Sequence, residues 1–356
     1  MLFFDAHLDL SLNALEYNRD LRLPVADIRR VESGLDDLSG RAAGTVSLHA
    51  MRQGNIGVCV ATLIAGCMKP PSPIGTWNSP PQAWAMTRGQ LAWYEAMQRE
   101  GEMRQICNAS QLQQHLQDWN QDRAETPIGY ILSLEGADSL RDLDDLQANY
   151  RAGLRALGPA HYGVGRYALG HDCDGGLTSR GKELLAEMDS LGIILDVTHL
   201  SEASFWEALD RYHGPIWASH HNCRALVDHP RQLSDRQIIA LAKRDGVIGV
   251  AMDMWMVVPN WKRRVTRHAD YQAADLSVLA DHVDHICQLT GDCRHVGIGS
   301  DLDGGFGTEQ SPADLDSIAD VSKLIGHLRQ RGYEEDDLQA IAAGNFLNFL
   351  SNALPS

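Results

Sequence analysis

The first strand-like segment of the chain, LFFDAHLDL at residues 2–10, carries a histidine between two aspartates. Alternate side chains of an extended strand share a face, so Asp5, His7 and Asp9 lie on one face and the apolar residues on the other. If the polar face is buried, it must be paired or bound to a cation, because a desolvated carboxylate is very costly. The alternative interpretation is a solvated amphipathic edge strand, and this segment alone does not decide between the two.

Residues of the same chemical types follow other apolar runs. Glu135 closes YILSLE, His199 closes IILDVTH, His220 closes IWASH and Asp301 closes VGIGSD. In a parallel barrel the carboxyl ends of the strands meet at one rim, which is where catalytic residues converge. Imidazole and carboxylate groups without a thiolate suit zinc or a similar divalent ion. Together with DAHLD, these residues predict a metal site.

The number of ligand-type side chains favours two ions over one. Two divalent ions at the usual separation of about 3.5–4 Å repel by roughly 20 kcal/mol at an effective dielectric constant of about 20. An anion must therefore lie between them. Glu135 is the natural bridging carboxylate because it is the lone acid on its strand, and Asp9 is the natural terminal ligand. We expect two divalent ions per subunit, of zinc or a similar metal.

Short apolar runs alternate with helix-like segments along the chain. The runs cover residues 2–10, 57–66, 129–138, 191–201, 215–222, 246–253 and 295–305. Strands that alternate with helices predict a parallel sheet, and seven or eight such units predict a closed barrel. We therefore expect an α/β fold, a (β/α)8 TIM-type barrel, in which residues 1–356 form a single domain.

One stretch departs from this alternation. Residues 67–84, CMKPPSPIGTWNSPPQAW, hold five of the 13 prolines of the chain and follow a predicted strand. The stretch is predicted to be a long loop at the rim where barrel active sites are walled. A surface insertion and a substrate-facing lid are equally compatible with it.

Composition excludes several classes of partner. The formal net charge of -16 argues against a nucleic acid or an anionic membrane as a partner. The 7 cysteines are scattered and form no CxxC pair, which favours buried thiols in a reducing compartment. No signal-peptide pattern and no long apolar run occur in the sequence. We expect a soluble cytoplasmic protein.

An ordered set of motifs resembles the membrane (renal) dipeptidase family, whose members are binuclear zinc barrels of the wider metal-dependent amidohydrolase type. The set begins with DAHLD at 5–9 and Ser133-Leu-Glu-Gly136, and continues with GGLTSRGKELLAEMDSLGIILDVTHLS at 175–201. Ser219-His220 and GIGSDLDGG at 297–305 complete it. The order and the gaps agree along essentially the whole chain, so the set is specific although each motif alone is weak.

The resemblance implies a ligand for every metal position. It assigns His7 and Asp9 to one zinc, His199 and His220 to the other, and Glu135 to both. His221, which directly follows His220, could be confused with the ligand.

Three further residues receive roles from the same resemblance. Asp301 lies beside a bridging hydroxide and acts as general base and then general acid. His161, in GPAHYG, helps to polarise the scissile carbonyl, and Arg231, in HPRQLSD, receives the substrate carboxylate. The sequence therefore predicts catalytic roles for Asp301, His161 and Glu135, and substrate binding by Arg231 and His161.

The function implied is that of a zinc dipeptidase that cleaves the peptide bond of dipeptides. One alternative is a related zinc amidohydrolase that acts on a non-peptide or cyclic amide, since fold does not determine function. Another is a catalytically silent metal-binding scaffold. We expect a small dipeptide substrate as partner, no nucleic acid or membrane, and allow for a homodimer.

Overall fold

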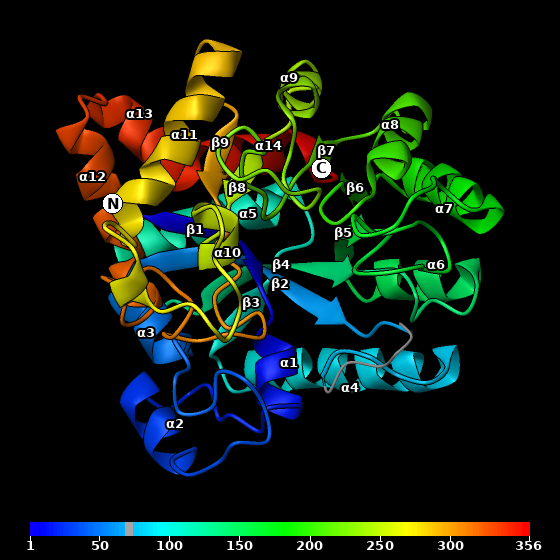
Figure 1. Cartoon of the computed structure of the whole chain (residues 1–356). Helices are drawn as coiled ribbons and strands as arrows, with labels where there is room; N and C mark the ends of the chain where they lie inside the picture. Colours follow the sequence, from blue (N-terminus) through cyan, green and yellow to red (C-terminus); the bar gives the residue numbers. More distant parts are fainter. Residues whose placement is uncertain (68–73) are drawn as a thin grey trace.

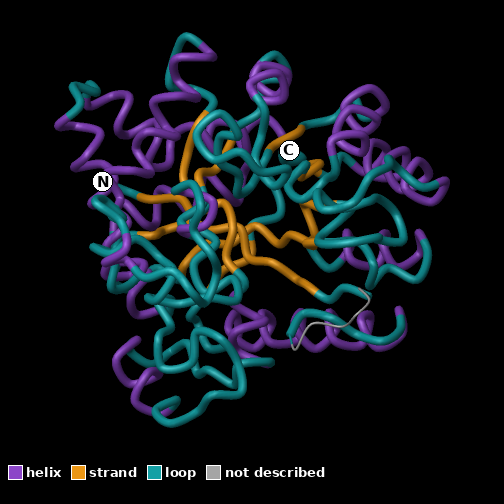
Figure 2. The backbone as a smooth tube through the Cα atoms, viewed as in Figure 1, coloured by secondary structure: helices purple, strands orange, loops and turns teal. Residues whose placement is uncertain are grey.

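The structure is a computed structural model that describes residues 1–67 and 74–356. Its strands gather in the middle of the molecule and its helices surround them (Figures 1 and 2). The strands are β1 (Phe3–Leu8), β2 (Ile56–Ile64), β3 (Met103–Gln105), β4 (Ile128–Glu135), β5 (Leu154–Gly158), β6 (Ile194–Asp196), β7 (Ile216–Trp217), β8 (Ile248–Val250) and β9 (Val296–Ile298).

Most helices connect one strand to the next. They are α1 (Leu10–Leu15), α2 (Val25–Val31), α3 (Leu48–Gln53), α4 (Pro80–Arg99), α5 (Ala109–Gln121), α6 (Leu143–Arg151), α7 (Ser179–Leu191), α8 (Glu202–Arg211), α9 (Asp235–Ala242), α10 (Met254–Val257), α11 (Leu276–Thr290), α12 (Ser322–Gln330), α13 (Glu335–Gln339) and α14 (Asn345–Ala353). Shorter turns are η1 (His268–Asp270), η2 (Ile318–Val321) and the π-helical η3 (Ala340–Gly344). Every helix of the described residues is too short or too polar to span a membrane.

All paired strands are parallel, and their order follows the chain. One sheet has the order β1-β2-β4-β5-β6-β7, with the short β3 added beside β4, and β8 pairs with β9. A parallel bridge between Ala218 and Ile248 connects β7 to β8. The remaining junction is held by side chains, because the backbone N–H of Ser300 donates to Asp5 at 2.9 Å. This arrangement confirms the predicted TIM-type α/β barrel.

The two faces of β1 differ as the alternation predicts. Phe4 stacks on Phe346 of α14, with 5.1 Å between the ring centroids, so this side chain faces the helical layer. Asp5 is fully buried on the opposite face and accepts hydrogen bonds from Ser300 and from the backbone N–H of His7. The whole of β1 is buried, so the alternative of a solvated edge strand is wrong.

Each of the seven predicted runs contains a strand, but two strands escaped prediction. Strand β5 has the sequence LRALG, in which an arginine interrupts a run of only five residues, and β3 is shorter still. Strand β3 pairs with β4, and β5 pairs with β4 on one side and β6 on the other. Their strand character therefore comes from a neighbour in the sheet, which local periodicity does not report.

Residues 68–73 of the proline-rich stretch lie outside the described residues, and the lid and surface-insertion interpretations of residues 67–84 stay predictions. The prediction of a loop through residue 84 is wrong at its end, because α4 begins at Pro80. Proline suits the first turn of a helix, where the missing N–H has no intrahelical partner to lose.

A buried arginine joins the segment after α1 to the loop after β9. Arg19 is only 4% exposed and donates to both carboxylate oxygens of Glu32 at 2.8 and 3.0 Å. It also contacts Asp303 Oδ2 at 3.2 Å, while Asp303 accepts from the backbone N–H groups of Thr45 and Val46. Two segments that are distant in sequence are thus held together by one cation.

Replacing Arg19 by methionine should destabilise the protein by about 3–5 kcal/mol, because buried carboxylates then lose their cation. Urea unfolding followed by circular dichroism measures the change. Arg22→Met is the matched control: Arg22 is 45% exposed and pairs with Asp20 and Glu100, so its loss should cost about 0–1 kcal/mol. Equal effects of the two substitutions would contradict a central role for Arg19.

Candidate metal centre

The five predicted metal ligands and the predicted catalytic Asp301 lie at the carboxyl ends of their strands. His7 is in β1, Asp9 comes directly after that strand, and Glu135 is the last residue of β4. The other three each lie three residues after the end of a strand, and they are His199 after Asp196, His220 after Trp217 and Asp301 after Ile298. Parallel strands bring these ends to one rim, as the sequence predicts.

Glu135 lies at the centre of the group. Its Oε2 atom is 3.3 Å from His7 Nε2. Its Oε1 atom is 3.0 Å from His199 Nε2 and 3.5 Å from His220 Nε2. One carboxylate therefore contacts imidazoles from β1 and from the loops after β6 and β7.

Three sets of ligand atoms are close enough to share an ion. They are His7, Asp9 and Glu135; then Glu135, His199 and His220; and then His7, His220 and Asp301. Glu135 belongs to the first two sets, so one side chain connects them. His221 belongs to none of them, and its Nδ1 atom instead lies 3.2 Å from Arg231 Nη1.

The pKa values of Glu135 and His7 show that positive charge stabilises the cluster. Burial by itself would raise the pKa of Glu135, but the nearby His7 and His161 lower it to about 2. Burial opposes protonation of His7, yet Glu135 and Asp9 outweigh it and hold the pKa of His7 well above its usual value. In the protein alone, a proton on His7 offsets part of the carboxylate charge.

The donor set fits a divalent metal. The Nε2 atom of His7 and the Oε1 atom of Glu135 are buried and have no partner with hydrogen-bond geometry in the described structure. Burial lowers the pKa of His199 and of His220 well below its usual value, which keeps both rings neutral, the form that binds metals. Their Nε2 atoms face each other at 3.1 Å. Buried ligand atoms without a hydrogen-bond partner, such as His7 Nε2 and Glu135 Oε1, are stabilised by a bound cation.

Neighbouring groups hold the proposed ligands in place. Ser219 Oγ lies 2.9 Å from His220 Nδ1, which leaves the Nε2 atom of that ring free to face Glu135. Thr62 donates its hydroxyl to Asp9. Asp196 accepts from the backbone N–H groups of Thr198 and Ser219, and so connects the segments that carry His199 and His220.

The backbone at the rim is strained at two of the predicted site residues, His199 and Asp301. His199 and Asp301 have positive φ angles of 67° and 57°, a conformation that costs a non-glycine residue about 1–2 kcal/mol. Gly299 permits a close approach, since a Cβ atom there would lie 1.8 Å from the carbonyl oxygen of Ser219. The ligand loops therefore adopt tight paths that packing imposes.

A cavity of about 340 Å³ opens above the cluster. Its floor includes Asp9, Glu135, His199, His220 and Asp301, and His161 lies on its wall with Nε2 at 3.9 Å from Glu135 Oε1. The described residues Ile74 to Thr76 also line it, so part of the proline-rich stretch borders the site.

Arg231 does not line this cavity. It is 1% exposed and lies behind the imidazoles, where Nη2 donates to the carbonyl oxygen of His220 at 2.9 Å and approaches His199 Nε2 at 3.5 Å. Its Nε atom has no hydrogen-bond partner among the described residues. The structure thus brings Arg231 beside the metal-ligand candidates as a buried cation.

Sequence reasoning missed several residues of the cavity wall, namely Tyr17, Tyr162, Arg263 and Arg264. The position of Tyr162 directly after His161 was a usable signal. The two arginines follow α10 and lie far along the chain from any recognised motif, so the sequence carried no local sign of their role.

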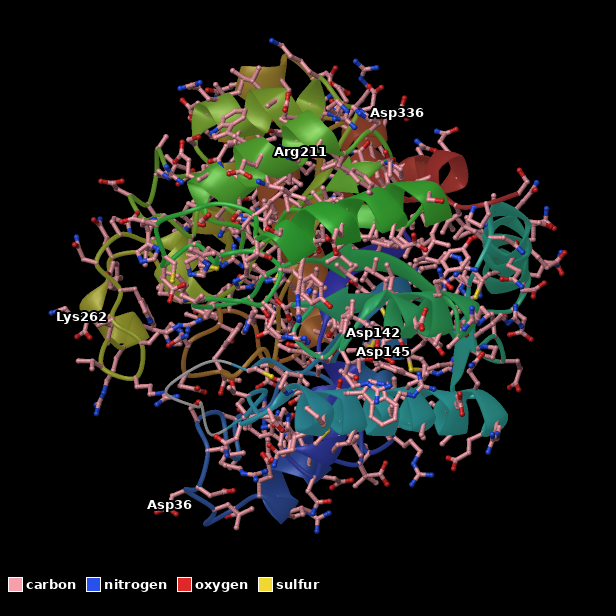
Figure 3. The ribbon with its side chains drawn as sticks, turned by 90° about the vertical axis from the view of Figure 1, so that its right-hand side faces the viewer. Asp36, Asp142, Asp145, Arg211, Lys262 and Asp336 are labelled. Atoms are coloured by element: carbon pink, nitrogen blue, oxygen red, sulfur yellow. The ribbon has the colours of Figure 1, made fainter. Side chains whose placement is uncertain are left out.

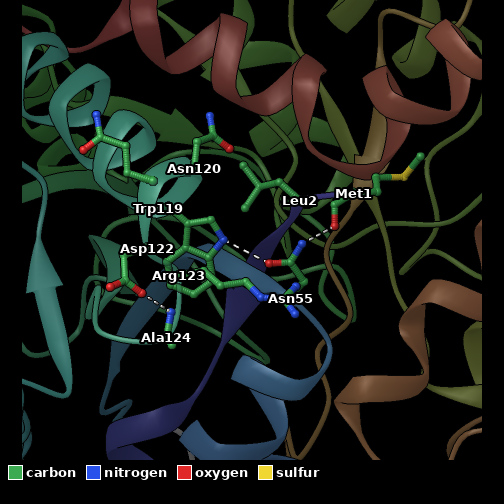
Figure 4. Close-up of a pocket in the computed structure, with 9 residues that line it drawn as sticks. Met1, Leu2, Asn55, Trp119, Asn120, Asp122, Arg123 and Ala124 are labelled. Carbon is green, nitrogen blue, oxygen red and sulfur yellow. Dashed lines mark hydrogen bonds between the residues drawn. The ribbon is translucent and has the colours of Figure 1, made fainter.

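The opposite end of the barrel has a different character. The pocket in Figure 4 is lined by residues that precede strands, among them Met1 and Leu2 before β1 and Asn55 before β2. Trp119 Nε1 donates to Asn55 Oδ1 at 3.0 Å there. None of the three sets of ligand atoms found among the described residues includes a residue of this pocket. The metal-ligating chemistry is concentrated at the carboxyl end.

A parallel barrel with buried imidazoles and carboxylates at this rim has the donor set and the site position of a metal-dependent enzyme. A family model described as membrane dipeptidase, peptidase family M19, matches residues 1–354. The chain belongs to this family, and it is a metallopeptidase. The resemblance inferred from the motifs is confirmed.

Individual relatives agree with the family. A solved dipeptidase of family M19 is 25% identical and has a TM-score of 0.77, and the match covers 100% of this chain and 99% of that one. A metallopeptidase from Rhodobacter sphaeroides, solved with a phosphinate mimic of the dipeptide L-Ala-D-Ala, shares the fold, with a TM-score of 0.79 and 22% identity over 99% of both chains.

Two curated relatives match part of the chain. An uncharacterised protein from the pqqA 5' region of Klebsiella pneumoniae is 30% identical over 65% of this chain and 84% of its own length. Dipeptidase aclJ from Aspergillus oryzae is 30% identical over 63% of this chain, and the match spans 52% of that protein, about half of its length.

Proposed function

We propose that this metallopeptidase hydrolyses the peptide bond of dipeptides at a site for two Zn²⁺ ions. The observation that carries the proposal is the position of Glu135, whose two oxygens contact different groups of imidazoles. A bridging carboxylate of this kind lowers the repulsion between two closely spaced divalent ions. The dipeptidase relatives supply the substrate class.

The proposed ligands divide between two ions. His7, Asp9 and Glu135 would hold one, and Glu135, His199 and His220 the other, in agreement with two of the three close sets of ligand atoms. Imidazole and carboxylate donors favour zinc over calcium or magnesium, which prefer oxygen ligands alone. When bound, zinc would polarise a carbonyl group and lower the pKa of water to about 7, the chemistry that supplies a hydroxide nucleophile near neutral pH.

The chain's own residues then position the substrate and move protons. Asp301 borders the cavity with its Oδ1 atom 4.0 Å from His7 Nε2, where it can accept a proton from the attacking water and pass it to the leaving amine. His161 lies on the wall beside Glu135, in position to donate to the scissile carbonyl oxygen. Arg231, a buried cation beside the ligands, would attract the free C-terminal carboxylate.

A volume of about 340 Å³ suits a short substrate rather than a folded chain. It lies at the lower end of the range of about 300–1,000 Å³ that is typical of small-molecule sites. A non-peptide or cyclic amide remains the second candidate for the same chemistry. A silent scaffold is disfavoured, because a purely structural site has no need of Asp301 at the cavity surface. The cytoplasmic location, the single-domain organisation and the homodimer stay predictions.

A panel of dipeptides and cyclic amides, assayed with and without a chelator, tests this function directly. Hydrolysis of dipeptides should require metal and should return when Zn²⁺ is added back. Zinc-dependent hydrolysis of cyclic amides alone would establish the second candidate, and metal binding without any hydrolysis would indicate the scaffold.

The substitution Glu135→Gln should reduce bound zinc from two ions per chain to one or none, because the bridging charge is lost. Elemental analysis of the purified protein measures this independently of activity. Glu125→Gln, at an exposed position far from the site, is the control and should retain both ions. Full zinc content in Glu135→Gln would remove Glu135 from its bridging position.

The substitution Asp301→Asn should lower kcat by about 10²–10⁴, the usual contribution of a general base, with the zinc content unchanged. Steady-state kinetics and elemental analysis on the same preparation separate the two effects. Loss of zinc would instead make Asp301 a ligand, in keeping with its proximity to His7 and His220. Turnover close to that of the unaltered protein would exclude it from proton transfer.

A further inference from the structure

The mouth of the cavity is built by two loops that meet above the metal centre. Asp37 to Ser39 come from the loop after α2, and Arg263 and Arg264 come from the segment between α10 and η1. Arg264 Nη2 donates to Ser39 Oγ at 3.2 Å, which connects the two loops directly. In Figure 3, Asp36 and Lys262 mark these loops along the same edge of the molecule.

Most charges at this mouth are already neutralised. Arg41 pairs with Asp37 at 2.8 Å and with Glu32 at 2.7 Å. Arg263 pairs with Asp253 at 2.7 Å, and its guanidinium lies over the ring of Trp255 at 4.7 Å from the centroid. Asp253 is fully buried and also accepts from Gln310 Nε2, so it holds Arg263 in place. Neither Arg41 nor Arg263 therefore has positive charge to spare for a ligand.

Arg264 is the exception. Within residues 1–67 and 74–356, no ion pair involves it, and Ser39 supplies a neutral hydrogen bond only. Its backbone has a φ of 65°, a conformation that is costly for a residue with a Cβ atom and that must be held by the loop around it. The cavity mouth therefore presents one uncompensated guanidinium in a chain whose net charge is -16.

Part of the cavity lining is apolar and is formed by a cluster that contains Leu12, Leu38, Ile64 and Ile74. A substrate in the cavity thus meets both hydrocarbon and the guanidinium of Arg264, which has no carboxylate partner among the described residues. The cavity can therefore distinguish substrate side chains that have similar shapes but different charges.

We propose that Arg264 binds an acidic side chain of the substrate, an inference that rests on the proposed function. The enzyme would then prefer dipeptides that contain aspartate or glutamate. The scissile bond must reach Glu135 and Asp301 at the floor, and the α-carboxylate lies only one residue from that bond. It therefore stays deep in the cavity, near the imidazoles of His199 and His220 behind which Arg231 lies. A side-chain carboxylate extends further from the backbone, toward the mouth where Arg264 lies.

Isosteric pairs of dipeptides test the preference. We expect kcat/KM for Ala-Glu over Ala-Gln, or for Glu-Ala over Gln-Ala, to favour the acid by about tenfold, the usual scale of a charge-assisted hydrogen bond at a partly exposed position. Arg264→Gln should bring that ratio close to one and leave hydrolysis of Ala-Ala within about twofold. Arg264→Glu should shift the preference toward lysine-containing dipeptides.

Lys262→Gln is the matched control, because it removes one positive charge from the same loop and Lys262 does not line the cavity. The acid preference should survive in this variant. Equal hydrolysis of acid and amide by the unaltered enzyme, or a preference that persists in Arg264→Gln, would overturn the inference alone. Failure to hydrolyse Ala-Ala or any other dipeptide in the presence of zinc would overturn the proposed function as well.

Discussion

The concentration of carboxylates in a buried space is the constraint on which the rest of the structure depends. Asp9, Glu135 and Asp301 all lie within reach of the Nε2 atom of His7, and such a group of anions is stable only beside positive charge. In the protein alone, His7 supplies part of that charge by retaining a proton. A divalent cation supplies more, and this need explains why metal dependence is built into the barrel and is not an addition to it.

The fold holds this cluster through contacts that are themselves polar. Ser300 donates to Asp5 and so holds the loop that carries Asp301 against the strand that carries His7. Asn13 Nδ2 donates to the carbonyl oxygens of both Asp9 and Asp303, each at 3.0 Å, which links the same two regions a second time. Because each buried donor and acceptor in these links is paired, the rim is rigid where ligands must not move.

Chemistry and selectivity are placed at different depths of the same cavity. The floor is made of residues attached to strand ends, whose positions the barrel determines. The mouth is made of loops such as the one that carries Arg264, which are joined by few contacts and can vary without disturbing the floor.

The sequence by itself determined the features that depend on local periodicity. Alternation along β1 placed His7 and Asp9 on one face, apolar runs followed by polar residues located the rim, and the recurrence of strands and helices predicted the barrel. The tertiary structure decided that Glu135 lies between two groups of imidazoles, that His220 and not His221 faces it, and that LRALG is a strand. It also brought Arg264 to the cavity and set Arg231 behind the ligands. These outcomes rest on contacts between residues far apart in the chain, and the path of each loop follows from packing against the whole barrel rather than from its own sequence.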